Sequence, residues 1–459
     1  MDPEPIRYYS TNHGVEPVTL REALLFGQAA DRGLFMPERL PTLTAADLAG
    51  LASRTYPQVA FEVLRRFTAG MVDDACLEAL CHDAYSYDVP LEKVAGGPTR
   101  LYLMRLDQGP TASFKDFAAR MMARWMGHIL AGDPQELVIL TATSGDTGSA
   151  VAHAYYGVPG IRIVVLFPLE EVSNRQRKQM TTLGKNVTTH GVDGKFDDCQ
   201  ALVKRAFADP ALSSIRLSSA NSINIGRLLP QAVYYVYAYT RLARGGEPVV
   251  FSVPSGNFGD LMGSVLALRM GLPISRILIA TNSNDEVPKF LETGRYDKIV
   301  PSRVCLSNAM NVGHPSNLAR LVDVYGGQMD ETGDLKRAPD LTAMRRDLWS
   351  VSIDDAQTRA TIKQAYERHR VVLEPHGAVG LAGLWRYLEA HPDAARQLLV
   401  SVETAHPAKF PEEIQALLGL DPPVPPALAG LEDKPEHYDR LTTHYEPFRD
   451  LLLRDFGGR

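Results

Sequence analysis

The chain has 459 residues, of which 45% are hydrophobic and 22% are charged, and its formal net charge is -6. This composition is typical of a globular protein, and the length predicts two or three domains because single cores rarely exceed about 250–300 residues. A mildly acidic chain without long single-sign runs argues against nucleic acid as the main partner. The four cysteines have neither zinc-site spacing nor the density of a disulfide framework, so we expect reduced thiols and no metal site.

The sequence also argues against membrane insertion and export. No apolar run approaches the roughly 20 residues needed to span a bilayer. Residues 1–5 lack the basic and apolar blocks of a signal peptide. We therefore expect a soluble, cytoplasmic protein without a membrane partner.

Apolar spacing changes along the chain. Residues 1–95 are expected to be mixed and mainly helical, because segments 43–51, 59–67 and 77–84 have helix-like apolar spacing. The cluster Gly96-Gly97-Pro98 is interpreted as a linker. Short apolar runs then alternate with helical stretches, which predicts an α/β protein with a mostly parallel sheet over residues 96–420. The predicted strands are 137–140, 161–166, 249–253, 277–280 and 398–402. The proline-rich tail, 421–459, is interpreted as peripheral.

Ligands in such folds bind at the carboxyl ends of strands, so the turns after the strands, together with glycine turns that start helices, are the candidate sites. In residues 109–117 a Gly-Pro turn leads into a helix, with Lys115 at or near its start and an aromatic residue close on either side. A helix N-terminus and apolar neighbours both lower a lysine pKa, as imine formation requires. Taken alone, such a lysine is more often a surface residue. The prediction therefore depends on the other turns.

Three further turns carry candidate residues. The turn 255–260, Ser-Gly-Asn-Phe-Gly-Asp, resembles a phosphate cradle because backbone N–H groups converge there at a helix start, although the dinucleotide fingerprint is absent. The turn 141–148, after which a helix is expected from Ala150, could receive a small anion such as a carboxylate, and a capped helix explains it equally well. In the turn 403–410, the hydroxyl of Thr404 could face a ring nitrogen, whereas His406 alone is more often structural.

These motifs resemble the threonine synthase family and occur in that family's order, from about residue 8 to about residue 420. Weaker matches lie at residues 9–11, 33–37, 221–224, 281–285, 307–310 and 374–376. Two segments depart from the family pattern. Asp107-Gln108 stands where many relatives have Phe-His, and Asn174 stands where many have Pro. The strongest matches are Gly-Pro-Thr-x-x-Phe-Lys-Asp-Phe, Thr-x-Thr-Ser-Gly-Asp-Thr-Gly, Ser-Gly-Asn-Phe-Gly-Asp and Thr-Ala-His-Pro-Ala-Lys-Phe.

The resemblance implies a fold, a cofactor and residue roles. The fold is that of tryptophan synthase β and its relatives, with two parallel-sheet lobes around pyridoxal 5'-phosphate and an N-terminal mainly helical domain. Lys115 would be the catalytic Schiff-base lysine, and Thr404 would offer its hydroxyl to the pyridine nitrogen. Ser144, Asp146 and Thr147 would line the substrate site. The residues implied to hold the cofactor phosphate are Gly256, Asn257, Phe258, Gly259 and Asp260.

The implied activity is that of a lyase converting O-phospho-L-homoserine and water into L-threonine and phosphate, with Lys178 and Arg227 as candidate cations for the substrate phosphate. A phospho-lyase or γ-replacement enzyme on the same scaffold shares every cofactor residue and stays open. A nucleotide-binding protein is disfavoured because both common nucleotide motifs are absent. A catalytically dead scaffold is disfavoured by the presence of Lys115 and Thr404. We expect three regions, 1–95, 96–420 and 421–459, and a monomer rather than a dimer.

Overall fold

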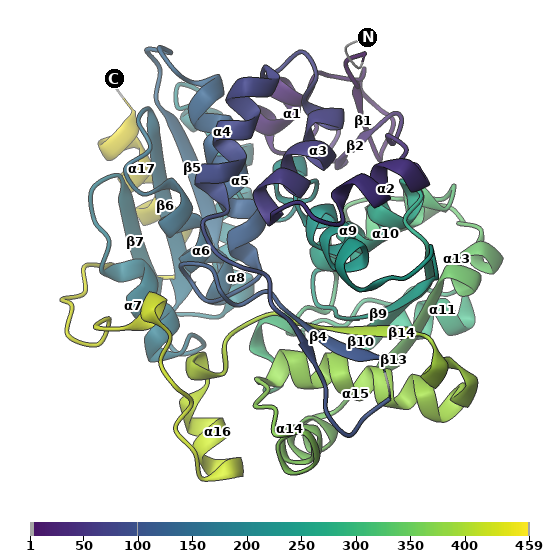
Figure 1. The fold of residues 1–459 in the computed structure, drawn as a ribbon. Coiled ribbons are helices and arrows are strands. Elements are labelled where there is room, and N and C mark those ends of the chain that lie inside the picture. The colour runs from purple at the N-terminus through teal and green to yellow at the C-terminus, as the bar shows by residue number, and fades with distance from the viewer. Residues whose placement is uncertain (1–3, 99, 458–459) are drawn as a thin grey trace.

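The computed structural model describes residues 4–98 and 100–457. Two parallel sheets lie side by side with helices on their faces, and the N-terminal helices pack against one end of both lobes (Figure 1). Helices cover the faces of such sheets because parallel strands need crossover connections. The predicted α/β fold with two parallel-sheet lobes is confirmed.

The larger sheet has six strands in the order β13-β10-β9-β14-β4-β3, and only β3 runs antiparallel to its neighbour. Its two central strands are buried at every residue, because α15 (Pro375–Ala390) packs on one face and α10 (Gly259–Arg269) on the other. The strands are β3 (Leu91–Lys93), β4 (Leu101–Arg105), β9 (Val249–Pro254), β10 (Ile274–Thr281), β13 (Leu348–Ser352) and β14 (Leu398–Glu403).

The smaller sheet has five parallel strands in the order β15-β7-β6-β5-β8. Its edge strand β15 comes from the tail, and α17 (Tyr445–Phe456) packs on α8 (Phe196–Ala208). The tail, interpreted as peripheral, therefore completes this lobe. The strands are β5 (Leu137–Ala142), β6 (Ile161–Pro168), β7 (Val187–Val192), β8 (Leu217–Ser219) and β15 (Asp439–Leu441).

The N-terminal region is mainly helical, as expected, and a short antiparallel pair, β1 with β2, lies on either side of α1 in its first part. Two helices begin three residues before their predicted starts because polar caps precede the apolar spacing; Asp73, for example, accepts the N–H of Cys76. Gly96 to Pro98 lie in the turn between β3 and β4, not in an open linker. The elements are β1 (Tyr8–Ser10), α1 (Leu20–Phe26), β2 (Phe35–Pro37), α2 (Ala45–Leu51), α3 (Tyr56–Thr68) and α4 (Asp74–Ala84).

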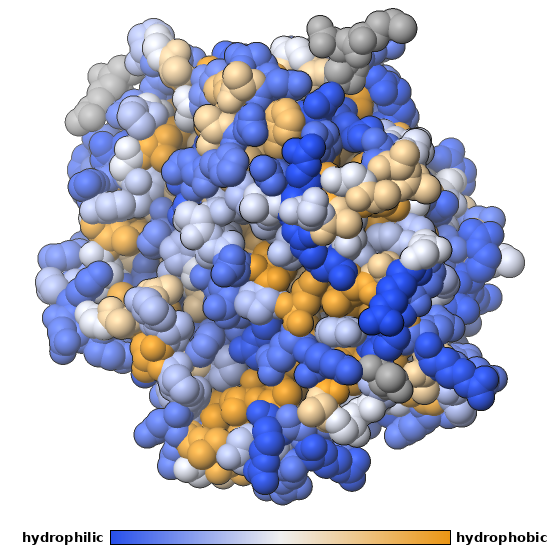
Figure 2. Space-filling view, viewed as in Figure 1, coloured by the Kyte–Doolittle hydropathy of each residue, from blue (hydrophilic) through white to orange (hydrophobic). Residues whose placement is uncertain are grey.

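The remaining elements connect the strands. In the described part of the chain, no helix is long and apolar enough to cross a membrane. Polar side chains cover most of the face in Figure 2, with hydrophobic residues gathered near its middle and lower part. The connecting elements are α5 (Lys115–Ile129), α6 (Asp146–Tyr155), α7 (Asn174–Thr181), α9 (Gln231–Leu242), α10 (Gly259–Arg269), α11 (Glu286–Thr293), α12 (Leu318–Val324), β11 (Gln328–Met329), β12 (Leu335–Arg337), α13 (Leu341–Asp347), α14 (Asp355–His369), α15 (Pro375–Ala390) and α16 (Pro411–Leu418).

Candidate active site

Lys115 is the first residue of α5, the position that the Gly-Pro turn indicates. The next residue, Asp116, fastens this turn: its carboxylate accepts the backbone N–H of Thr111 at 2.8 Å and the hydroxyl of Thr111 at 2.7 Å. A Cβ at Gly109 would collide with Asp116, so the turn requires glycine there. Apolar residues at helical spacing along α5 are all buried, namely Phe117, Met121, Trp125 and Ile129.

The segment before Lys115 pairs with the turn after β14. The N–H of Phe114 donates to the carbonyl of Thr404 at 2.9 Å, and the N–H of His406 donates to the carbonyl of Ala112 at 3.0 Å. These bonds bracket an isolated antiparallel bridge between the two segments. Lys115 and Thr404, which are distant in sequence, therefore lie in adjacent segments of the same site.

The amine of Lys115 lies in a buried region with charges of both signs. Burial is the largest influence and lowers the pKa of Lys115, as the sequence predicts. The carboxylates of Asp146 and Glu374 raise this pKa, whereas the cations Lys409 and Arg227 lower it further. The nearby charges oppose one another, so the exclusion of water sets the direction of the shift.

The turn 255–260 connects β9 to α10 at the carboxyl end of the sheet. Phe258 has a left-handed backbone conformation with φ of 63°, and Gly259 is the first residue of α10. A Cβ on Gly256 would lie 2.7 Å from the Cα of Met310, so only glycine fits this cradle without a backbone shift. The backbone of the turn therefore approaches the 308–310 segment closely, as a phosphate-binding turn requires.

Asn257 is fixed by neighbours on both sides. Its amide donates to the hydroxyl of Ser222 at 2.6 Å, and its side-chain oxygen accepts the N–H of Ser316 at 2.8 Å. The amide of Asn317 donates to the backbone carbonyl of Asn257 at 2.9 Å. The side chain of Asn257 thus orders the turn itself.

Asp260 lies in the first turn of α10, and its carboxylate accepts the hydroxyls of Tyr234 and Tyr235, each at 2.6 Å. Burial raises the pKa of Asp260 to about 6, while the two tyrosine hydrogen bonds and the charge of Lys115 oppose that rise. Asp260 contributes to the turn by anchoring it to α9.

The turn 141–148 is tightly closed. The hydroxyl of Thr143 accepts the N–H groups of Gly145 and Gly148 at 2.9 and 2.7 Å. Ser144 and Thr147 are half-buried at this helix start. Helix α6 begins at Asp146 rather than at Ala150. The turn ends early because the hydroxyl of Thr143 accepts the N–H groups of Gly145 and Gly148. Ser144 and Thr147 therefore lie beside the first N–H groups of the helix.

Asp146 forms a buried ion pair that the sequence does not reveal. Its carboxylate is 2.6 Å from the amine of Lys409 and accepts the amide of Gln176 at 2.9 Å. Lys409 is fully buried and also donates to the carbonyl of Thr111 at 3.0 Å. Burial raises the pKa of Asp146, but the charges of Lys409 and Lys115 outweigh it and hold that pKa well below its usual range. Lys409 belongs to the Thr-Ala-His-Pro-Ala-Lys-Phe motif, which is the one signal that could have singled it out.

His376 is bonded to the 308–310 segment, against which the cradle packs. Its Nε2 accepts the N–H of Ala309 at 3.1 Å, so its proton lies on Nδ1, which donates to the carboxylate of Glu374. Ala309 precedes Met310, the residue against which Gly256 packs. This histidine and its carboxylate were not predicted as site residues.

The two cations suggested for a substrate phosphate lie in different surroundings. Arg227 is buried, donates to the carbonyl of Ala220 at 2.6 Å, and is close enough to lower the pKa of Lys115. Lys178 instead donates to the carbonyl of Glu432 in the tail. Of the two, only Arg227 is placed at the site of the lysine.

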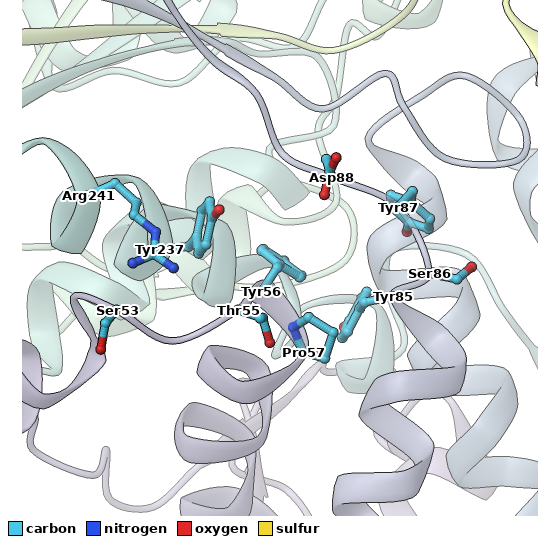
Figure 3. A pocket seen from close by; sticks show the side chains of 10 residues that line it. All are labelled: Ser53, Thr55, Tyr56, Pro57, Tyr85, Ser86, Tyr87, Asp88, Tyr237 and Arg241. Carbon is cyan, nitrogen blue, oxygen red and sulfur yellow. The ribbon is translucent and has the colours of Figure 1, made fainter.

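A separate cavity of about 350 Å³ lies between the N-terminal helices and α9 (Figure 3). Tyr56, Tyr85 and Tyr87 border it, and each packs against the ring of Phe117, which is two residues after Lys115. This aromatic cluster holds the first turn of α5 against α3 and α4. The other lining residues are Ser53, Thr55, Pro57, Ser86, Asp88, Tyr237 and Arg241.

The site suits pyridoxal phosphate. It has a half-buried lysine whose amine has a lowered pKa, a glycine cradle closed by Met310, and a buried threonine directly after β14. Imine formation needs the neutral amine, and a phosphate needs converging N–H groups; both are offered here. The role of each residue toward the cofactor stays a prediction.

Comparison with known proteins gives consistent matches along the chain. Residues 88–402 match the family of pyridoxal-phosphate dependent enzymes. Residues 7–85 match the threonine synthase N terminus, and residues 377–451 match the threonine synthase C-terminal family. Together these three matches cover nearly all of the chain.

Individual relatives agree over their full lengths. Threonine synthase of Haemophilus influenzae is 38% identical, covering 97% of this chain and 99% of the relative. The crystal structure of pyridoxal-phosphate-bound threonine synthase from Brucella melitensis superposes with a TM-score of 0.90 at 33% identity, covering 98% of this chain and 99% of that one. Threonine synthase from Escherichia coli gives a TM-score of 0.86 at 35% identity, with the same coverage. The chain belongs to the threonine synthase family of pyridoxal-phosphate-dependent lyases.

Proposed function

We propose that this chain converts O-phospho-L-homoserine and water into L-threonine and phosphate, with Lys115 as the catalytic residue. One observation carries the proposal: the hydrogen bonds between residues 112–114 and 404–406 bring the lysine and Thr404 to one site. The 255–260 turn is linked to the same region because Gly256 packs against Met310, and the neighbouring Asn308 donates to Gln176, the partner of Asp146. Family membership supports the same activity.

Lys115 has the properties that proton transfer requires. Its pKa is lowered mainly by burial, so a larger share of the amine is neutral near pH 7 than for an exposed lysine. In that form its Nζ accepts the proton from Cα of the substrate and returns a proton to the neighbouring carbons. When bound, pyridoxal phosphate supplies the electron sink for the electrons that each proton leaves behind.

The other predicted residues hold and orient. The N–H groups of Gly256 through Asp260 bind the cofactor phosphate at the start of α10, and Asn257 fixes the turn in position. The hydroxyl of Thr404 faces the pyridine nitrogen. Since a hydroxyl is a much weaker acid than an ammonium or a carboxylic acid, that nitrogen stays largely unprotonated.

The substrate binds opposite the cofactor turn. Ser144 and Thr147, at the start of α6, bind its carboxylate with the first N–H groups of the helix. Asp146 is held by Lys409 and Gln176, so it positions this turn instead of meeting the substrate carboxylate directly. The buried guanidinium of Arg227, whose charge lowers the pKa of Lys115, is the candidate cation for the substrate phosphate.

The test is product analysis of the purified holoenzyme. Phosphate and L-threonine should appear in equal amounts from O-phospho-L-homoserine, and Lys115→Ala should abolish both, together with the visible absorbance of the bound cofactor. Lys185→Ala, which removes an exposed-loop lysine stacked on Tyr156, is the matched control and should keep full activity. Release of 2-oxobutyrate and ammonia in place of threonine would instead favour the sibling phospho-lyase.

The proposal also covers the regions of the chain, its oligomeric state, its location and its partners. We propose three regions, 1–95, 96–420 and 421–459, a monomeric state, a cytoplasmic location and no nucleic-acid partner. Limited proteolysis should first cut near residues 95 and 420 if those boundaries are right. Light scattering that gives twice the mass of 50.5 kDa would contradict the monomer.

A further inference from the structure

Arg320, on helix α12, is a fully buried arginine whose partners are neutral. Its guanidinium donates to the carbonyls of Ser222 at 2.9 Å, Ile223 at 2.6 Å and Phe35 at 3.3 Å. It also donates to the side-chain oxygen of Asn317 at 2.6 Å. Within the described residues, these carbonyl and amide dipoles satisfy the hydrogen bonding of the guanidinium but bring no negative charge.

A buried cation without a counter-ion is unusual. Buried charges in proteins are ordinarily paired, because the loss of hydration is only partly offset by neutral dipoles. Burial lowers the pKa of Arg320 to about 9, and no carboxylate in the described part of the chain offsets that effect. A group with this pKa is still charged at neutral pH. The structure therefore contains a positive charge that an anion could balance.

The partners of Arg320 are the same residues that hold the cofactor turn. Asn317, which accepts from Arg320, donates to the backbone carbonyl of Asn257. The carbonyl of Ser222 accepts a hydrogen bond from Arg320, and the hydroxyl of Ser222 accepts one from the side-chain amide of Asn257. Two independent chains of hydrogen bonds thus join the guanidinium to opposite sides of Asn257. Only one residue, Asn317 or Ser222, would lie between the guanidinium of Arg320 and the 255–260 turn that holds an anion.

Two further sequence segments meet the 255–260 turn at this arginine. Residues 33–37 supply the carbonyl of Phe35, residues 221–224 supply two carbonyls, and the turn 255–260 is reached through Asn317. Both segments match the family pattern, yet neither contains a catalytic group. A common function in forming the phosphate site accounts for both.

We propose that Arg320 is a positioning residue for the cofactor phosphate, and that the phosphate dianion is the counter-ion of its buried charge. The inference rests on the proposed function, because it takes the 255–260 turn as the phosphate site. Arg320 acts through Asn317 and Ser222, and it acts on the phosphate without affecting the pyridine ring. A merely structural arginine would instead support both parts of the cofactor equally.

Comparing two ligands separates these roles. The full-length protein, stripped of cofactor, is titrated with pyridoxal 5'-phosphate and with pyridoxal, which lacks the phosphate, and the ratio of the two dissociation constants is measured by fluorescence. In Arg320→Met this preference for the phosphorylated ligand should fall about tenfold or more. Arg320→Lys, which keeps the charge, should recover most of it. An equal loss for both ligands in Arg320→Met would overturn the proposal.

A matched control and a second neutral variant complete the design. Arg345 on α13 is exposed and also donates to two backbone carbonyls, those of Leu291 and Glu292, neither of which belongs to a segment that holds this turn, so Arg345→Met should leave the ratio unchanged. If Arg320→Met does not fold, Arg320→Gln provides the neutral side chain, since its amide can still donate to the carbonyls. A ratio in Arg320→Gln equal to that of wild type would count against the phosphate as counter-ion.

Inorganic phosphate provides a test that needs no variant. Added to the cofactor-free wild-type protein at pH 7.5, it should raise the thermal midpoint of unfolding, and this rise should shrink in Arg320→Gln. No shift in the wild-type protein would refute the inference. The proposed function is judged separately: if wild type makes threonine while the ligand ratio is indifferent to Arg320, only the role of this arginine is wrong.

Discussion

Replacing Lys409 with methionine tests the buried ion pair beside the lysine of α5. Lys409 is fully buried and Asp146 is nearly so, and their charged atoms are 2.6 Å apart. Methionine has a similar length but no charge, so Lys409→Met leaves the carboxylate of Asp146 buried with Gln176 as its remaining partner. The variant therefore isolates the charge of Lys409.

Removal of one member of a buried pair typically destabilises a protein by about 3–5 kcal/mol, because the other charge is left without compensation. Asp146→Asn should have a similar effect for the same reason. In the double variant neither charge is left alone, so its loss should be smaller than the sum of the single losses by about 1–3 kcal/mol. The loss of the Thr111 hydrogen bond is common to both variants at position 409 and cancels in this comparison.

Urea unfolding of the wild-type protein, Lys409→Met, Asp146→Asn and the double variant measures this coupling. Strictly additive losses of unfolding free energy would refute the ion-pair reasoning. Catalysis provides an independent measurement. The charge of Lys409 lowers the pKa of Lys115, so Lys409→Met should raise that pKa and move the acid limb of the kcat profile, which reports the enzyme–substrate complex in which the amine is free, to higher pH. A limb that stays in place or moves to lower pH would contradict the assignment of Lys115 as the base.

Two further predictions concern the cofactor turn. Gly256→Ala places a Cβ 2.7 Å from the Cα of Met310, so it should weaken binding of pyridoxal phosphate about tenfold or more in a fluorescence titration while the secondary structure is retained. Burial raises the pKa of Asp260 to about 6, above the roughly 3.9 of an unfolded chain, so protonation favours the folded state. The unfolding free energy of the cofactor-free protein should therefore fall by about 2 kcal/mol as pH rises from about 4 to 6, and Asp260→Asn should lack this fall.

The sequence predicts the strands and the turns at their ends, and these turns contain most of the residues of the candidate site. Buried parallel strands are continuous apolar runs, so β5, β6, β9, β10 and β14 were all found, although each extends one to four residues beyond its predicted limits. Chemistry follows the carboxyl ends of such strands, which led directly to the turns at 141–148, 255–260 and 403–410. The start of α6 was placed four residues late because the hydroxyl of Thr143 closes the turn from within.

The sequence does not predict contacts between distant residues. Lys409 and Asp146 are 263 positions apart, and neither the spacing nor the residue types indicate that the two would pair. Likewise, Gln176 reaches the site from α7, in a segment that departs from the family pattern. Lys409, Asp146 and Gln176 are polar side chains whose burial is stabilised only by partners in the folded protein. The local sequence pattern around each residue does not indicate which distant residue will be its partner.

The N-terminal region contributes backbone acceptors to the segments around the cofactor turn, in addition to its aromatic contacts with α5. Arg320 donates to the carbonyl of Phe35, and Asn224, in the segment that holds Asn257, donates to the carbonyl of Leu24 at 2.9 Å. If residues 1–95 were removed, both buried donors would lose an acceptor, at about 1–3 kcal/mol each. Because the same segments order the 255–260 turn, this loss should weaken cofactor binding as well as stability. A chain starting at residue 96 should therefore not bind pyridoxal phosphate as tightly as the full chain, and equal affinity would show that the N-terminal carbonyls are dispensable.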